Sequence, residues 1–156
     1  FPLICRCIEM FLSRVVDTSF IVLCVLAALV TITSFGQEAI TVLEMVTETH
    51  PFYHRPWNLL GWTYATYPER DIRNPQSAMM CALSANQLTQ FRNAEYLDSL
   101  AAAYAEAGQF DDAISTQIDA IDRLSTTPER AGFLERLEMY RQNEPFREDP
   151  RDGDYR

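Results

Sequence analysis

Apolar positions recur at helical spacing along residues 95–124, with a glycine in the middle of the run. In the first half, Leu97, Leu100 and Tyr104 share one face of a helix, and alanines fill many of the positions between them. Gly108 tolerates the left-handed backbone with which many helices end, and two aspartates follow it, where carboxylates favour the positive start of a new helix. The pattern therefore predicts two helices joined by a tight turn.

This stretch resembles one tetratricopeptide repeat (TPR), a helix–turn–helix unit of about 34 residues. Residues 97–121 follow the order L-x2-L-A-x2-Y, then a glycine, an aromatic residue and A-I-x5-A-I. A more specific match comes earlier in the chain, where W-x2-L-G-x2-Y is fitted by Trp57, Leu60, Gly61 and Tyr64. Two TPR-like first helices are therefore expected.

The second helices show a repeat as well. Ala78 and Ala85 stand seven residues apart, and a second pair of alanines has the same spacing about one repeat later. Gln117 departs from the family, which usually has an aromatic residue there. The two first-helix motifs are farther apart than one repeat, so we expect the extra residues in a turn at residues 67–74, which prolines border.

The resemblance implies an all-α fold: a TPR-like helical-hairpin solenoid of about two and a half repeats with a C-terminal capping helix, preceded by a hydrophobic N-terminal helix. The capping helix would begin near Pro128 and present an apolar face formed by Phe133, Leu134, Leu137 and Tyr140. Three regions are predicted: a hydrophobic N-terminal segment (1–36), a helical repeat domain (37–143) and a disordered polar tail (144–156).

The N-terminal region contains no charged residue between Asp17 and Glu38. About 20 uncharged residues in a helix rise about 30 Å, which is the thickness of the hydrocarbon core of a bilayer. Residues 18–36 therefore fit a single-pass membrane helix or, with Met10 as the start, a signal peptide. Arginines precede the stretch and glutamates follow it, which favours repeats on the outer side of the membrane, or export. The alternative is a buried first repeat helix in a cytoplasmic protein.

The composition argues against several classes of function. The chain has 22 acidic and 13 basic residues, and its net charge of -9 opposes the binding of nucleic acid. Every basic residue is an arginine, so the chain offers no lysine nucleophile and no phosphate-loop lysine, and its five glycines form no glycine-rich phosphate-binding loop. We therefore expect no enzyme activity and no cofactor.

The two histidines, His50 and His54, stand four residues apart and would share a metal ion if both lay on one helix. Pro51 and Pro56 interrupt a helix there, so the segment is predicted to link two helical hairpins, with a short metal-binding module as the less favoured alternative. Acidic pairs elsewhere fit helix starts and solvated faces. No catalytic residue and no metal site are expected.

Because no catalytic residue or metal site is expected, the remaining candidate site is a binding surface. In TPR proteins the first helix of each repeat lines a concave groove, and the matching positions here include Arg55, Asn58, Trp62, Glu95, Asp98 and Glu106. The acids at Asp98 and Glu106 do not suit the terminal carboxylate of a peptide. Trp62 beside acids would instead bind an extended peptide with a basic or apolar side chain. Packing of Trp62 against Trp57 or the next hairpin is the competing interpretation.

These observations predict a non-catalytic protein–protein interaction module or scaffold of TPR type, membrane-associated or exported, which binds a peptide or partner protein in an acidic and aromatic groove. Self-association that lengthens the stack of repeats is a further expectation, because stacking supplies the core of such folds. The alternative is the accessory C-terminal repeat region of a larger membrane-bound enzyme or sensor.

Overall fold

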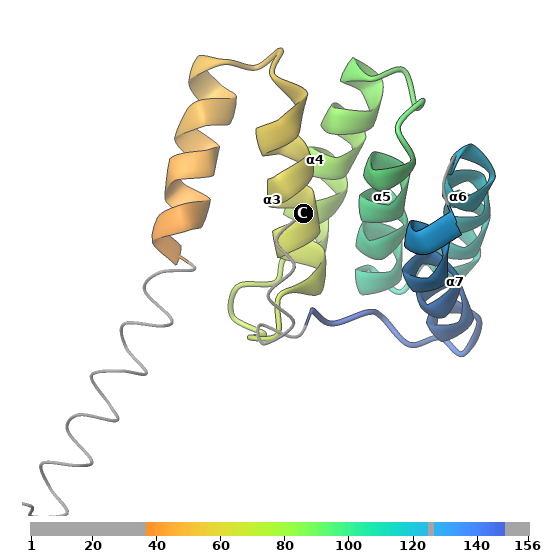
Figure 1. The fold of residues 1–156 in the computed structure, drawn as a ribbon. Helices are drawn as coiled ribbons and strands as arrows, with labels where there is room; N and C mark the ends of the chain where they lie inside the picture. Colours follow the sequence, from red (N-terminus) through yellow and green to blue (C-terminus); the bar gives the residue numbers. More distant parts are fainter. Residues whose placement is uncertain (1–36, 125–126, 149–156) are drawn as a thin grey trace, which may run out of the picture. The chain divides into compact units, whose positions relative to one another are not determined.

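The computed structural model describes residues 37–124 and 127–148 (Figure 1). All regular structure in these two ranges is helical, which confirms the prediction of an all-α fold. Residues 37–49 form the first described helix. It is followed by α3 (His54–Thr66), α4 (Pro75–Leu88), α5 (Ala94–Glu106), α6 (Phe110–Arg123) and α7 (Thr127–Arg141). The packing described below is that of the compact unit that begins at Ile40.

Side-chain caps and one glycine set the helix ends. The side chain of Asn74 accepts hydrogen bonds from two backbone N–H groups in the first turn of α4, and Asn93 does the same for α5. These bonds satisfy donors that a helix start otherwise leaves unpaired. Gly108 adopts φ +76 between α5 and α6, as the predicted tight turn requires. The turn at residues 67–74 lies between α3 and α4, where the sequence places the extra residues of that repeat.

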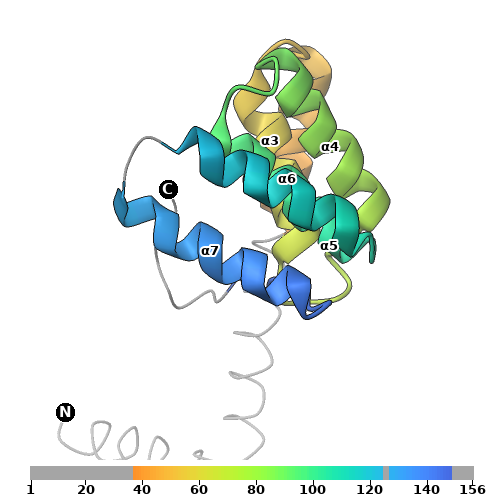
Figure 2. The same ribbon diagram turned by 90° about the vertical axis from the view of Figure 1, so that its right-hand side faces the viewer.

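Each helix packs on its neighbours in chain order. The α3 helix contacts α4 and α5, α4 contacts α5, α5 contacts α6, and α6 contacts α7. Figure 2 shows α7 running beside α6. The first described helix joins this unit through buried Ile40, which packs in one apolar cluster with Leu60 of α3 and Cys81 of α4. The Tyr64 hydroxyl also donates a hydrogen bond of 2.6 Å to the Glu44 carboxylate.

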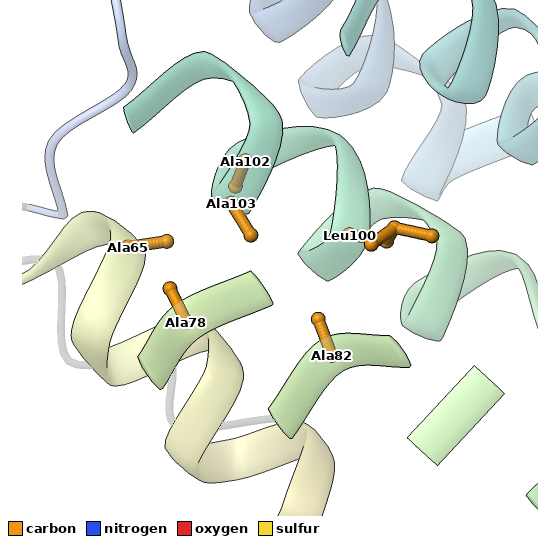
Figure 3. Packing of buried hydrophobic residues seen from close by; sticks show 6 residues of the cluster. All are labelled: Ala65, Ala78, Ala82, Leu100, Ala102 and Ala103. Atoms are coloured by element: carbon orange, nitrogen blue, oxygen red, sulfur yellow. The ribbon is translucent and has the colours of Figure 1, made fainter. Parts of the chain in front are cut away.

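Small side chains bring α3, α4 and α5 close together. In Figure 3, Ala65 of α3 and Ala78 of α4 point toward each other, and Ala103 of α5 belongs to the same buried cluster. A Cβ atom added at Gly61 would lie 2.8 Å from the backbone nitrogen of Ala82. The glycine of the W-x2-L-G-x2-Y motif is therefore required by the close approach of α4 to α3.

The last helix buries most of the face that its sequence pattern predicts. Phe133 and Leu137 pack with Leu97 and Ile121, and Tyr140 is fully buried beside α5 residues. Leu134 is the exception to the prediction, because its side chain is exposed. Consecutive side chains of a helix point in different directions, so Phe133 and Leu134 cannot both face the core. Phe133 points inward.

The predicted N-terminal helix at residues 18–36 lies outside the described residues, so its membrane, signal and repeat interpretations all stay predictions. Across the two described ranges, none of the helices has the length and apolar character that crossing a bilayer requires.

Candidate binding face

Three of the six predicted groove residues lie in one connected set of contacts on α3 and α5. These are Trp62, Asp98 and Glu106. The set is completed by Arg136 of α7 and by residues 144–148, which we call the C-terminal segment. We call this surface the α3–α5 face.

Asp98 is buried and carries a two-point ion pair with Arg136. The Nε of Arg136 donates to Oδ1 at 2.8 Å, and Nη2 lies 2.8 Å from Oδ2. The side-chain amide of Gln117 donates a further bond of 2.7 Å to Oδ1 and one of 3.0 Å to the Phe133 carbonyl. Burial raises the pKa of the Asp98 carboxyl, and Arg136 and Gln117 oppose that shift. The arrangement fixes the guanidinium in one orientation.

The guanidinium of Arg136 also lies among three aromatic rings. Its central carbon is 4.9 Å from the centre of the Phe133 ring, 5.5 Å from that of Trp62 and 5.3 Å from that of Phe146. These are distances at which a cation is attracted to a ring face. Arg136 thus links the buried acid to the aromatic part of the face.

Trp62 makes its aromatic contact with the C-terminal segment. The ring centres of Trp62 and Phe146 are 5.7 Å apart, and the Trp62 indole N–H donates a bond of 3.1 Å to the Glu148 carboxylate. The Glu148 backbone N–H donates to the carbonyl of Thr66 at 3.0 Å. Trp57 instead donates its indole N–H to the Pro51 carbonyl.

Arg147 occupies the acidic end of the face. Its Nη2 lies 2.6 Å from Oε2 of Glu106, and its Nη1 donates to the Ala65 carbonyl at 3.3 Å. The other carboxylate oxygen of Glu106 accepts a bond of 3.2 Å from Nε of Arg73. Ala65 and Glu106 lie at the C-terminal ends of α3 and α5, where free carbonyls and the helix dipoles favour a positive charge.

The first residues of the predicted polar tail lie on the α3–α5 face. Residues 144–156 were expected to form a disordered tail, whereas Phe146, Arg147 and Glu148 contact the α3–α5 face. Because the tail is polar in composition, the sequence did not indicate that these three residues match the chemistry of this face. Figure 1 shows the segment running from the end of α7 toward the end of α3. Residues 149–156 lie outside the described part of the chain.

The other three predicted groove residues are not part of this set. Arg55 and Glu95 are exposed near the starts of α3 and α5, and the Glu95 backbone N–H is capped by Asn93. Asn58 is half-buried one turn before Trp62. Within the described residues, Asn58 Oδ1 is shielded from solvent and has no hydrogen-bond donor.

Neither histidine lies in a cluster that would hold a metal ion. His54 Nδ1 is hydrogen-bonded to the Tyr96 hydroxyl at 2.7 Å, and His50 Nδ1 to the Thr49 hydroxyl at 2.9 Å. Among the side chains of residues 37–124 and 130–148, there is no group of three or more His, Cys, Asp or Glu suited to a metal.

Sequence reasoning missed Arg136, Gln117 and the C-terminal segment. A signal for Arg136 was present, because it lies three residues after Phe133 and four before Tyr140, on the side of the helix that the apolar pattern buries. Gln117 was noted only as a departure from the family's aromatic residue. A charged and a polar residue at two buried positions of facing helices indicate a buried polar network.

Comparison of the chain with models of protein families, with curated proteins and with solved structures found no match. The assignment of a function therefore depends on the geometry of the α3–α5 face.

Proposed function

We propose that residues 37–143 form a non-catalytic, TPR-type interaction module whose α3–α5 face binds an extended segment of a partner protein. The observation that carries this proposal is the C-terminal segment itself. A short non-helical stretch lies on this face, and its contacts there include a main-chain hydrogen bond, side-chain hydrogen bonds, aromatic contacts and an ion pair. These are the contacts by which a protein surface recognises an extended peptide.

The charged groups of the face support binding rather than chemistry. Asp98 is fully engaged by Arg136 and Gln117, and Glu106 lies between Arg73 and Arg147. Carboxylates whose oxygens are held by neighbouring side chains are not free to exchange a proton with a substrate, whereas general acid–base catalysis needs a carboxyl group within reach of the reacting atoms.

The TPR assignment is supported by the packing order of the helices. In a stack of helical hairpins, each first helix packs on its own second helix and on the next first helix, as α3 does with α4 and α5. The close approach at Gly61 gives a physical reason for the glycine of the family motif. The proposal includes membrane association or export through residues 18–36, which carbonate extraction of the full chain and of a chain starting at Gln37 would test.

A peptide display experiment tests the binding function. The full chain is used to select binders from a library of random peptides. Their affinities are then measured for Glu106→Gln and Asp111→Asn in a chain whose C-terminal segment is already released by Phe146→Ala and Arg147→Ala. Glu106 lies on the α3–α5 face, whereas Asp111 is an exposed acid in the first turn of α6. Loss of one charged hydrogen bond should weaken binding about tenfold or more for Glu106→Gln and leave Asp111→Asn unchanged.

Circular dichroism on both variants controls for unfolding. If the selected peptides bind Glu106→Gln and Asp111→Asn equally well, the α3–α5 face is not the binding surface. If no peptide is selected by wild type or by a variant whose C-terminal segment is released, the proposed function is wrong.

A further inference from the structure

The C-terminal segment has the features of a ligand bound within its own chain. Its contacts come from three consecutive residues, each of a different kind: an aromatic ring from Phe146, a guanidinium from Arg147, and a backbone N–H with a carboxylate from Glu148. The receiving groups are the Trp62 ring, the Glu106 carboxylate and free carbonyls at the end of α3. The segment thus shows which chemistry the face accepts.

Building on the function proposed above, we propose that residues 144–148 are an intramolecular ligand of the α3–α5 face. The partner that displaces them is an extended protein segment in which an aromatic residue is followed directly by arginine. The order matters because the aromatic and cationic sites are adjacent on the face. Phe146 lies against Trp62 and Arg136, and the next residue reaches Glu106.

The receiving side is held in place by contacts that do not involve the segment. Arg136 is fixed by Asp98, and Oε1 of the Glu106 carboxylate accepts a hydrogen bond from Nε of Arg73. The buried clusters that join α3, α4 and α5 consist of alanines and leucine from those helices. Departure of the segment therefore leaves a preorganised site, which is the condition for binding a partner at low cost in conformational freedom.

The acidic end of the face selects arginine in particular. Arg147 uses one Nη atom for the Glu106 carboxylate and the other for the Ala65 carbonyl, so two acceptors on different helices are bridged by one planar group. A guanidinium presents donors in a fixed fork, whereas the ammonium of lysine is a point charge. Both acceptors lie at helix C-termini, which favour a cation.

The short connection between α7 and the C-terminal segment determines how strongly the segment competes with a partner. Asn143 adopts φ +58 just after α7 and turns the chain out of the helix, so the segment begins directly beside the face. A short tether gives an effective concentration on the order of millimolar. A free five-residue peptide would have to match that concentration to displace the segment, and a longer partner that makes further contacts would do so at much lower concentration.

Fluorescence anisotropy with a labelled peptide tests the inference. The probe is Glu-Pro-Phe-Arg-Glu, the sequence of residues 144–148, titrated with full-length wild type, Arg147→Glu and Phe146→Ala. Both variants remove a contact of the internal ligand and leave the receiving side intact, so the probe should bind them at least about tenfold more tightly than wild type. Arg141→Glu is the matched control, since Arg141 is exposed at the end of α7 and pairs with Glu138.

The control peptides Glu-Pro-Ala-Arg-Glu and Glu-Pro-Phe-Glu-Glu should bind none of the proteins. Equal affinity of the probe for wild type and both released variants would overturn the intramolecular ligand. If library peptides bind the face but the probe does not bind the released variants, the aromatic–arginine chemistry is wrong while the binding function stands. If light scattering shows that wild type forms dimers that Arg147→Glu does not, a second copy is the occupant and the displacing partner is wrong.

Discussion

Arg147 of the C-terminal segment and Glu106 at the end of α5 form an ion pair with 2.6 Å between Nη2 and Oε2. From the sequence, Glu106 is expected to line a groove for an extended peptide with a basic or apolar side chain. A basic side chain fills that position, and it comes from the chain's own C-terminal segment. Phe146, next to it, supplies the apolar side chain against Trp62. The proposed partner would present the same two kinds of side chain.

Replacing Arg136 by methionine should destabilise the fold strongly. The change leaves the buried Asp98 carboxylate without its cation, and breaking one side of a buried pair costs about 3–5 kcal/mol. Urea unfolding at pH 7 would measure the loss. The double variant Arg136→Met with Asp98→Asn should recover part of it, because the asparagine side chain needs no counter-charge.

The loss of folding stability caused by Arg136→Met should become smaller as the pH falls from 7 to 4. Burial raises the pKa of Asp98 in the folded chain, and Arg136 opposes that rise. Without Arg136, the pKa of Asp98 is therefore raised further. A carboxyl whose folded-state pKa exceeds its unfolded value binds more protons in the folded state, so its contribution to stability is present at low pH and is lost as the pH rises through the folded pKa. If the difference in stability between wild type and Arg136→Met did not change with pH, Asp98 would not stay buried in the variant.

Gly61→Ala and Gly132→Ala should shift the melting temperature in opposite directions. At Gly61 the new methyl group would lie 2.8 Å from the backbone of α4, and such overpacking costs about 1–3 kcal/mol. At Gly132 the nearest atom is the end of the Arg136 side chain at 3.5 Å, an ordinary contact, and alanine gains about 0.5–1 kcal/mol of helix propensity. Thermal melts followed by circular dichroism compare the two. Stabilisation by both would contradict the close packing of α3 and α4.

Cys81 should resist alkylation in the folded chain. Burial raises the pKa of its thiol to about 11 from a usual value of 9.0. Since only the thiolate reacts, the higher pKa lowers the rate of alkylation about 100-fold near pH 8 relative to the unfolded chain, before any steric protection. The measurement is iodoacetamide labelling, with and without guanidinium chloride, of a chain whose Cys5, Cys7 and Cys24 are replaced by serine. Equal rates in the two conditions would show that Cys81 is accessible.

The sequence predicted local features well because each has a short-range cause. Gly108 marks the turn between α5 and α6, and the insertion at residues 67–74 follows from two motif positions and two prolines. The ion pair between Asp98 and Arg136 could not be predicted in the same way. It joins two helices that are separated in the chain by α6, and its partners are specified only once the helices pack.

The C-terminal segment was missed for a related reason. Composition identifies residues 144–156 as too polar to form a core, and that conclusion concerns only whether the segment can bury its own surface. A polar segment can still bind to a surface that another part of the chain has formed. Glu106, Trp62 and the end of α3 provide that surface only after α3 and α5 are side by side.

The occupancy of the α3–α5 face is tested most directly by two-dimensional NMR of the indole N–H groups. The chain has two tryptophans, so two indole signals are expected from wild type. Trp62 bonds to Glu148, whereas Trp57 bonds to the Pro51 carbonyl and serves as an internal control. The variant Arg147→Glu should shift the Trp62 signal and leave that of Trp57 in place, and saturating Glu-Pro-Phe-Arg-Glu peptide should return the Trp62 signal toward its wild-type position. A Trp62 signal unchanged by the variant and by the peptide would contradict the account.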